Sequence, residues 1–146
     1  MASLVDTNIL VYRCDPRDSK KRSAATGLLR RGAASGDLRI PHQALLEFVS
    51  VATRKRRGSA PLMTHEAATR QVEEYMVQFP LLFPDEHVFR TALRGMAAYR
   101  MGWFDAHLWA YAERYAIGEI LSEDFEHGRW YGTVRVRNPF IESGLT

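Results

Sequence analysis

Hydrophobic and polar positions follow two periods along the chain, one typical of short buried strands and the other of amphipathic helices. Short apolar runs bounded by charged residues, proline or glycine predict strands at residues 2–6, 38–40, 79–83, 118–122 and 133–136. Apolar residues that recur every three or four positions predict helices from residue 7 and over residues 18–35, 42–56, 64–78, 84–99 and 105–115.

Strands that alternate with helices indicate β-α-β crossovers, in which parallel strands form a sheet covered by helices on both faces. Because the predicted strands are short, we expect a small, mostly parallel sheet of four or five strands. No repeat, low-complexity segment or linker divides the 146 residues, and a chain of this length buries one core. We therefore predict one domain, residues 1–146, with the architecture of a three-layer α/β/α sandwich.

The composition narrows the class of protein further. Hydrophobic residues make up 46% and charged residues 25%, which is typical of a globular protein and not of a disordered one. No apolar run approaches the roughly 20 residues that cross a bilayer, and the N-terminus lacks the pattern of a secretory signal. We expect a cytoplasmic protein without a membrane partner. The single cysteine, Cys14, excludes an internal disulfide and a zinc site built from several thiolates.

The charges are distributed unevenly. Twenty Lys and Arg against seventeen Asp and Glu give a net charge of +3, which is compatible with a polyanionic partner. The basic residues form clusters at 20–22, 30–31 and 54–57, each of which is either a solvated helix surface or a contact for phosphate groups. Several acids lie instead among apolar neighbours, where an unpaired carboxylate costs free energy. These acids are the candidates for a functional site.

Four acids occupy positions from which their carboxylates can converge. Asp6 ends the first predicted strand and Asp124 follows the fourth, and ligands of open α/β sheets bind beyond the carboxyl ends of strands. Asp105 is placed at the start of a helix, and Glu47 lies on the polar stripe of another. Each acid also has a simpler interpretation. Asp6 and Asp105 could cap helices, Asp124 could be a turn residue, and Glu47 could be solvated or paired with Arg54.

If the four carboxylates converge, their repulsion raises their pKa values or requires a cation between them. An all-oxygen set of ligands suits Mg²⁺ or Mn²⁺ better than zinc. Thr7, Asn8 and Ser122 are close to these acids in sequence, so their side chains can orient the carboxylates or bound water. Such a cation activates water and stabilises the charge that develops on a phosphodiester. The residues thus favour metal-dependent hydrolysis of phosphodiester bonds.

Five segments spread over the chain form a recognisable set. They are LVDTNILVY at 4–12, IPHQ at 40–43 leading to Glu47, WFDA at 103–106, ILSEDF at 120–125 and TVRVRNPF at 133–140. In order and spacing they resemble the PIN-domain family, and especially the VapC-type toxins of bacterial toxin–antitoxin pairs. The resemblance implies a PIN fold with an acidic pocket that binds Mg²⁺ or Mn²⁺ and cleaves RNA.

The resemblance also implies roles for individual residues. The four acids of the family correspond by position to Asp6, Glu47, Asp105 and Asp124. Asp6 and Asp105 are then the direct metal ligands, and the other two acids bind the metal directly or through water. Glu123 and Glu126 remain alternatives to Asp124 as the source of the last carboxylate.

Toxins of this type form homodimers and are inhibited by a cognate antitoxin, so the resemblance implies RNA, an antitoxin and a second copy of the chain as partners. One alternative function is a PIN-type nuclease that acts on DNA or in housekeeping RNA processing. Another is a non-catalytic module that responds to phosphate. An aspartate that ends the first strand of an α/β sheet also occurs in phosphoacceptor receiver domains, which resemble one another in a second acid beside that aspartate and a lysine late in the sheet. This chain has Thr7-Asn8 beside Asp6 and no lysine after Lys55, which argues against such a module.

Overall fold

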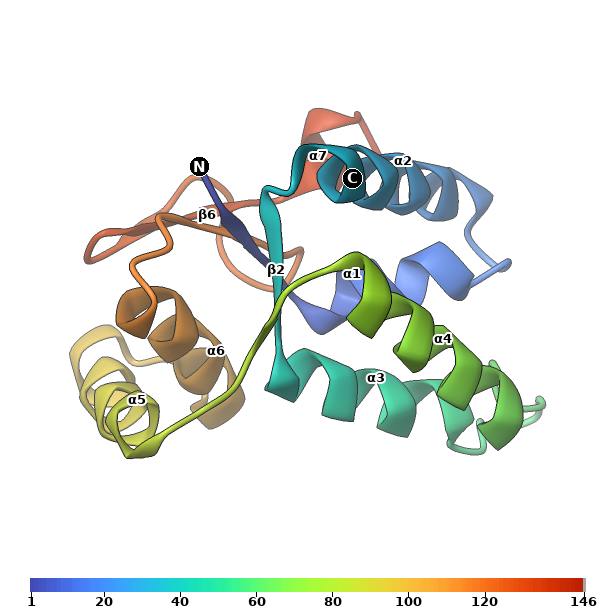
Figure 1. Ribbon diagram of the computed structural model, residues 1–146, viewed down its shortest axis with the longest axis horizontal. Helices are drawn as coiled ribbons and strands as arrows, with labels where there is room; N and C mark the ends of the chain where they lie inside the picture. Colours follow the sequence, from blue (N-terminus) through green and yellow to red (C-terminus); the bar gives the residue numbers. More distant parts are fainter. Residues whose placement is uncertain (146) are drawn as a thin grey trace.

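Six strands and seven helices make up residues 1–145, the part of the chain that the structure, a computed structural model, describes. The sheet lies in the middle, with helices on both faces (Figure 1), which confirms the predicted α/β class. The strands are β1 (Ser3–Val5), β2 (Leu38–Pro41), β3 (Leu81–Leu82), β4 (Glu119–Leu121), β5 (Trp130–Tyr131) and β6 (Val134–Arg137). The helices are α1 (Thr7–Cys14), α2 (Ser19–Ser35), α3 (His42–Thr53), α4 (His65–Gln78), α5 (Glu86–Tyr99), α6 (Trp103–Arg114) and α7 (Pro139–Glu142). Within residues 1–145, no helix combines the length and apolar character needed to cross a membrane.

The order of strands in the sheet is β3-β2-β1-β4-β6-β5, so β1 lies near the middle. Neighbouring strands run parallel, except that β5 and β6 form an antiparallel pair. In the register of β1 and β4, Val5 is paired with Leu121. The residues that follow them, Asp6 and Ser122, therefore leave the sheet side by side at its carboxyl edge.

Two short strands differ from the prediction of four or five strands. β5 is an additional antiparallel strand, joined to β6 by a turn in which Gly132 adopts a φ of 66° that glycine reaches without strain. The apolar segment at 79–83 contains only the two-residue β3. Phe79 is the C-cap of α4, and Pro80 has no N–H group to donate to a neighbouring strand. Both side chains of β3 are half-buried, as expected at the edge of a sheet.

Two helix boundaries differ from the prediction in ways that affect the candidate site. α3 ends at Thr53 rather than near residue 56, so the basic residues 54–57 follow the helix, where Arg56 forms an isolated bridge with Ser59. α6 begins at Trp103, with Gly102 as its N-cap. Asp105 therefore lies inside the first turn of α6 and does not begin the helix.

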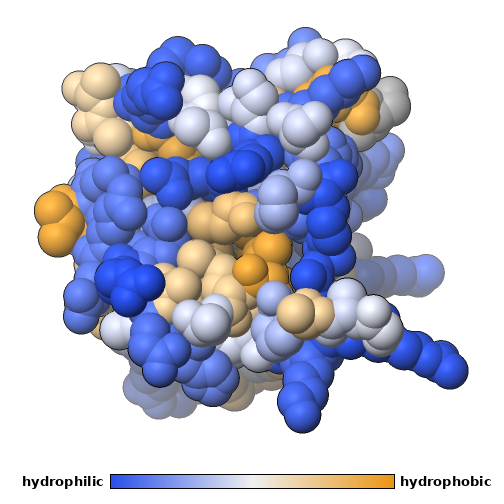
Figure 2. Space-filling model, turned by 90° about the vertical axis from the view of Figure 1, so that its right-hand side faces the viewer, coloured by the Kyte–Doolittle hydropathy of each residue, from blue (hydrophilic) through white to orange (hydrophobic). Residues whose placement is uncertain are grey.

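One side of the molecule, on which α2 and α4 lie, exposes apolar residues that are surrounded by hydrophilic ones (Figure 2). Between α2 and the neighbouring parts of α1 and α4 is a pocket of about 150 Å³, and Thr26, Leu29 and Ala33 of α2 contribute to its wall.

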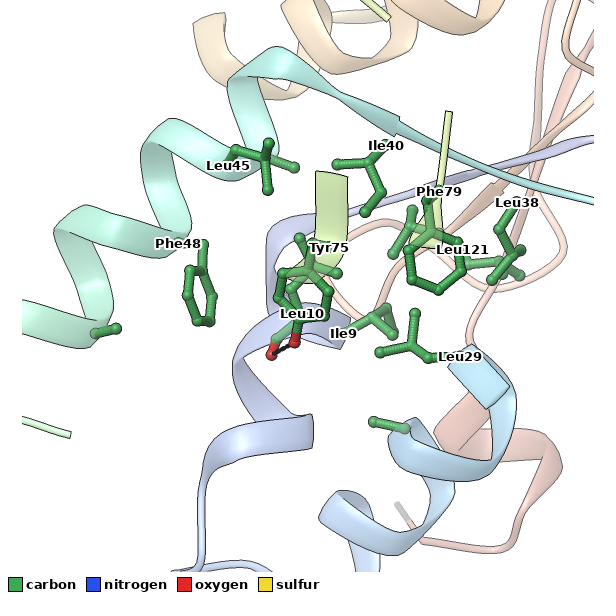
Figure 3. Close-up of a cluster of buried hydrophobic side chains, with 14 of the residues drawn as sticks. Ile9, Leu10, Leu29, Leu38, Ile40, Leu45, Phe48, Tyr75, Phe79 and Leu121 are labelled. Carbon is green, nitrogen blue, oxygen red and sulfur yellow. Dashed lines mark hydrogen bonds between the residues drawn. The ribbon is translucent and has the colours of Figure 1, made fainter. Parts of the chain in front are cut away.

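Side chains of β1 alternate between two cores, one on each face of the sheet. Val5 belongs to the core formed with α1, α2, α3 and α4, and Leu4 belongs to the core formed with α5 and α6. In the first core, the hydroxyl of Tyr75 donates a 2.9 Å hydrogen bond to the backbone oxygen of Leu10, which connects α4 to α1 (Figure 3). The first helix is thus held in place where it leaves the carboxyl edge of β1.

Candidate active site

Asp6 lies where β1 passes into α1, and its side chain is almost completely buried, with 6% of the residue exposed. Its Oδ1 accepts a 2.7 Å hydrogen bond from the backbone N–H of Thr7, so its interpretation as a helix cap is correct. Its Oδ2 accepts a 2.6 Å hydrogen bond from the hydroxyl of Ser122. Burial raises the pKa of Asp6 to about 7 despite these hydrogen bonds, and the charges of Asp124 and Glu47 contribute to the rise.

The side chain of Asn8 connects Asp6 to Asp124. Its Nδ2 atom lies 3.3 Å from an Oδ2 atom of each acid and 3.3 Å from the Oγ of Ser122. Ser122 also accepts a 3.0 Å hydrogen bond from the backbone N–H of Asp124. The amide oxygen of Asn8 is buried and has no hydrogen-bond partner among the described residues. Two acids and two neutral polar side chains thus form one cluster at the edge of the sheet.

The other two acids of the loop after β4 have different partners. Glu123 accepts hydrogen bonds from the hydroxyl of Tyr12 at 2.8 Å and from the ammonium group of Lys21 at 2.9 Å. Glu126 is exposed and pairs with an arginine of its own loop. Among these three acids, Asp124 is the one whose carboxylate lies against the cluster.

Glu47 reaches the same cluster from α3. The hydroxyl of Thr7 donates a 2.9 Å hydrogen bond to its Oε2, and the amide of Gln43 donates one of 2.9 Å to its Oε1. The interpretation of Glu47 as a partner of Arg54 is wrong, because its carboxylate is held by Thr7 and Gln43 and forms no ion pair with Arg54 among the described residues. Gln43 was not among the predicted site residues, although its position one helical turn before Glu47 was a usable signal.

Asp105 does not cap α6, so its interpretation as a cap is wrong. Gly102 occupies the N-cap position, and no side chain makes a capping hydrogen bond there. The pKa of Asp105 is raised above its usual value, first by burial and then by the charges of Asp124 and Glu47. The charges of Asp124 and Glu47 thus raise the pKa values of both Asp105 and Asp6.

The donor chemistry of this edge fits a hard divalent cation. Carboxylate oxygens and the unpartnered amide oxygen of Asn8 are the kinds of ligand that Mg²⁺ and Mn²⁺ prefer. In the described part of the chain, no three acidic, histidine or cysteine side chains are placed so as to surround an ion. Mg²⁺ does not need such a cage, because it keeps several water molecules and binds proteins through one or two carboxylates.

A pocket of about 310 Å³ opens onto the cluster. Its wall includes Thr7, Asn8, Glu47, Asp124 and Glu123. Asp6 is buried behind this wall, and Asp105 does not contribute to it. The wall also contains Arg17, an exposed side chain whose guanidinium group is held 2.6 Å from the carboxylate of Asp15. The pocket therefore gives a polar ligand direct access to Glu47 and Asp124. It reaches Asp6 only through Thr7 and Asn8, which are hydrogen-bonded to that acid.

The protein is thus an α/β sandwich with acids gathered at the carboxyl edge of its parallel strands. Residues 3–131 match the PIN domain family. This match covers most of the chain, so the protein belongs to the PIN domain family. No curated protein sequence matches the chain.

Solved structures with a similar fold include several toxin–antitoxin proteins. A chain of VapBC2 from Rickettsia felis, bound to a DNA fragment from their promoter, matches with a TM-score of 0.71 and 12% identity over 94% of this chain and 98% of that chain. VapC20 from Mycobacterium tuberculosis, a sarcin–ricin loop cleaving toxin, matches with a TM-score of 0.64 and 15% identity over 84% and 90% of the two chains. A toxin–antitoxin complex from Klebsiella pneumoniae matches with a TM-score of 0.68 and 16% identity over 94% and 98%. At these identities the likeness concerns the fold.

Proposed function

We propose that the protein is a metal-dependent endoribonuclease and the toxin of a VapBC-type toxin–antitoxin pair. The observation that carries this proposal is the cluster in which Asn8 and Ser122 connect Asp6 to Asp124. Acids gathered in this way at the edge of a PIN domain suit the hydrolysis of phosphodiester bonds. The likeness in fold to a toxin that cleaves the sarcin–ricin loop supports RNA as the substrate. Such a toxin acts in the cytoplasm, where its substrate is.

Each acid has a role in this proposal. Asp6 and Asp105 bind Mg²⁺ or Mn²⁺ directly, and Glu47 and Asp124 bind it directly or through water. When bound, the cation activates water and stabilises the negative charge that develops on the phosphodiester. Three neutral side chains hold the carboxylates through the hydrogen bonds described above: those of Thr7, Asn8 and Ser122.

Incubation of the protein with structured RNA, single-stranded RNA and duplex DNA tests this function. We expect cleavage of RNA with Mg²⁺ or Mn²⁺, loss of cleavage on chelation, and recovery when the metal is restored. Cleavage of DNA alone would favour the alternative nuclease. The absence of cleavage under all these conditions would favour the non-catalytic phosphate-responsive module. Chelator-resistant cleavage that depends on a histidine would rule out the proposed chemistry.

The basic segment after α3 is proposed to hold the RNA backbone. Arg54, Lys55 and Arg57 are exposed, whereas Arg56 is half-buried and donates hydrogen bonds of 2.9 and 2.8 Å to the backbone oxygen of Ala60. Arg56 therefore stabilises the turn, and the exposed side chains are the ones available to phosphate groups.

Replacing Arg54 and Arg57 together by Gln is expected to weaken the binding of all RNA sequences alike. The dependence of log affinity on log salt should become shallower by up to about 0.7 for each lost contact with a single strand. Affinity is measured by titration at several salt concentrations with chelator present, so that RNA stays intact. The matched control replaces Arg30 and Arg31, which are exposed on α2. A slope that equals the wild-type slope would mean that the segment is only a solvated surface.

Two apolar surfaces support the proposed protein partners. Leu46, Phe89 and Phe104 line one pocket of about 230 Å³ and are 60%, 49% and 68% exposed. We assign this surface, beside Asp105, to a second copy of the chain. We assign the apolar side that Figure 2 shows to an antitoxin segment.

Light scattering during size-exclusion chromatography tests whether the surface around Phe104 binds a second copy of the chain, since Phe104→Ser should shift a dimer toward a monomer. A wild-type mass of one chain at high concentration would reject it.

A further inference from the structure

The side-chain amide of Gln43 makes three contacts that link α3 to α6. Its Nε2 donates a 2.9 Å hydrogen bond to Oε1 of Glu47 and one of 3.0 Å to the backbone oxygen of Phe104. Its Oε1 lies 2.7 Å from Nδ1 of His107. Both N–H groups of the amide and one lone pair of its oxygen are therefore in use.

These partners determine the orientation of the amide. An ionised carboxylate and a backbone carbonyl only accept hydrogen bonds, so the NH₂ group of Gln43 must face Glu47 and Phe104. The amide oxygen then faces His107, whose Nδ1 must carry a hydrogen to donate to it. The neutral imidazole is consequently fixed in its Nδ1–H tautomer. His107 in turn packs against the ring of Tyr111, with 5.4 Å between ring centroids.

The linked groups belong to the two helices that carry acids of the cluster. Glu47 is held at Oε2 by Thr7, next to Asp6, and at Oε1 by Gln43. The carbonyl group that Gln43 contacts belongs to Phe104, the residue immediately before Asp105 in the first turn of α6. A single amide thus connects the carboxylate of one acid to the backbone beside another.

We propose that Gln43, oriented by His107, is a positioning residue that fixes the carboxylate of Glu47 relative to Asp105. This inference rests on the proposed metal-dependent nuclease function. Without the amide, Oε1 of Glu47 has no donor from α3, and repulsion from the other acids turns the carboxylate toward solvent. Partners that orient metal ligands typically contribute about 10-fold to 100-fold to metal affinity or activity. Gln43→Leu should therefore reduce kcat and metal affinity by about 10-fold or more, with little change in the KM for RNA.

The test compares wild type with Gln43→Leu, His107→Phe and the double variant. The matched control is Gln78→Leu, because Gln78 likewise donates to a glutamate four residues away, Glu74, at 3.3 Å on the exposed surface of α4. The dissociation constant for Mn²⁺ is measured by titration of the metal ion, and kcat and KM are measured with RNA. We expect His107→Phe to lower kcat and metal affinity, as Gln43→Leu does. The double variant should have about the same kcat and metal affinity as Gln43→Leu. The control should match wild type.

A separate spectroscopic measurement uses the metal-free protein. At pH 8, the ¹⁵N shifts of the His107 ring should report the Nδ1–H tautomer in wild type and a mixture dominated by Nε2–H in Gln43→Leu. If wild type binds no Mn²⁺ and cleaves no RNA, the proposed function is wrong. If wild type does both, and Gln43→Leu and His107→Phe retain its metal affinity and kcat, the positioning role is wrong. Effects of the two substitutions that simply multiply in the double variant would also overturn it.

Discussion

Asp6→Asn is expected to abolish RNA cleavage and most of the stabilisation by Mg²⁺, while leaving the metal-free protein at least as stable as wild type. Asn keeps an oxygen that accepts the capping hydrogen bond from Thr7, so the start of α1 is preserved. The substitution removes a buried negative charge that Asp124 and Glu47 repel. It also removes a proposed direct metal ligand, so the loss of cleavage arises without a loss of folding.

Thermal and urea unfolding with and without Mg²⁺ measure this prediction. The free energy of unfolding of wild type should rise by about 2.7 kcal/mol at a Mg²⁺ concentration of one hundred times Kd. Asp6→Asn and Asp105→Asn should gain much less. Asp85→Asn is the matched control, because Asp85 also caps a helix, through a 2.8 Å hydrogen bond from the backbone N–H of Val88, but lies outside the cluster. It should respond to Mg²⁺ as wild type does.

Opposite results would remove the basis of the four-acid site. If Mg²⁺ shifts none of these transitions and Asp6→Asn still cuts RNA, the acids are not the catalytic group. A Mg²⁺ response that survives in Asp6→Asn but disappears in Asp85→Asn would place the ion at another helix terminus.

The carboxyl edge of the sheet was predictable from the sequence because local patterns define it. The apolar segment before Asp6 and the one before Ser122 read as buried strands, and parallel strands end at the same edge. This rule placed Asp6 and Asp124 at the same edge of the sheet and made the convergence of their carboxylates a hypothesis. The bond from Asn8 to Asp124 was not predictable, because it joins residues 116 positions apart through side-chain rotamers.

Other features of the site depend on tertiary packing that sequence patterns do not record. Asp105 could be read as a helix cap because aspartate is a common cap, but the N-cap of α6 is Gly102, which has no side chain to signal its role. Gln43 and Glu47 have the spacing of an ordinary solvated pair on a helix. Only the approach of α6, with Phe104 and His107, distinguishes them from such a pair.

The free energy of unfolding of the metal-free protein should fall as the pH rises from about 4 to about 7, and Asp6 is the main cause. Its pKa is raised from 3.8 to about 7 in the folded state. Between these values the folded protein keeps a proton that the unfolded chain has released, so stability falls with rising pH. The raised pKa of Asp105 acts in the same direction. Between pH 5 and pH 7 the loss of unfolding free energy that Asp6 causes should reach about 3 kcal/mol at most, since each pH unit corresponds to about 1.4 kcal/mol for one group.

Acids with lowered pKa values act at lower pH and with the opposite sign. The pKa of Asp15 is lowered, chiefly by its hydrogen bonds from Arg17, so the stability it contributes is present above the unfolded pKa and is lost as the pH falls through the folded pKa. Its effect therefore lies below about pH 4, outside the window in which Asp6 titrates.

Urea unfolding at pH 5, 6, 7 and 8, with chelator or with saturating Mg²⁺, separates these effects. In chelator, wild type should lose stability up to about pH 7, whereas Asp6→Asn should lose much less. Because a metal ion binds only the ionised carboxylate, the additional stability that Mg²⁺ confers on wild type should grow over the same pH range. Asp85→Asn should follow the wild-type profile throughout. Parallel profiles for wild type and Asp6→Asn in chelator would show that Asp6 ionises at its ordinary pKa and that burial does not strain the cluster.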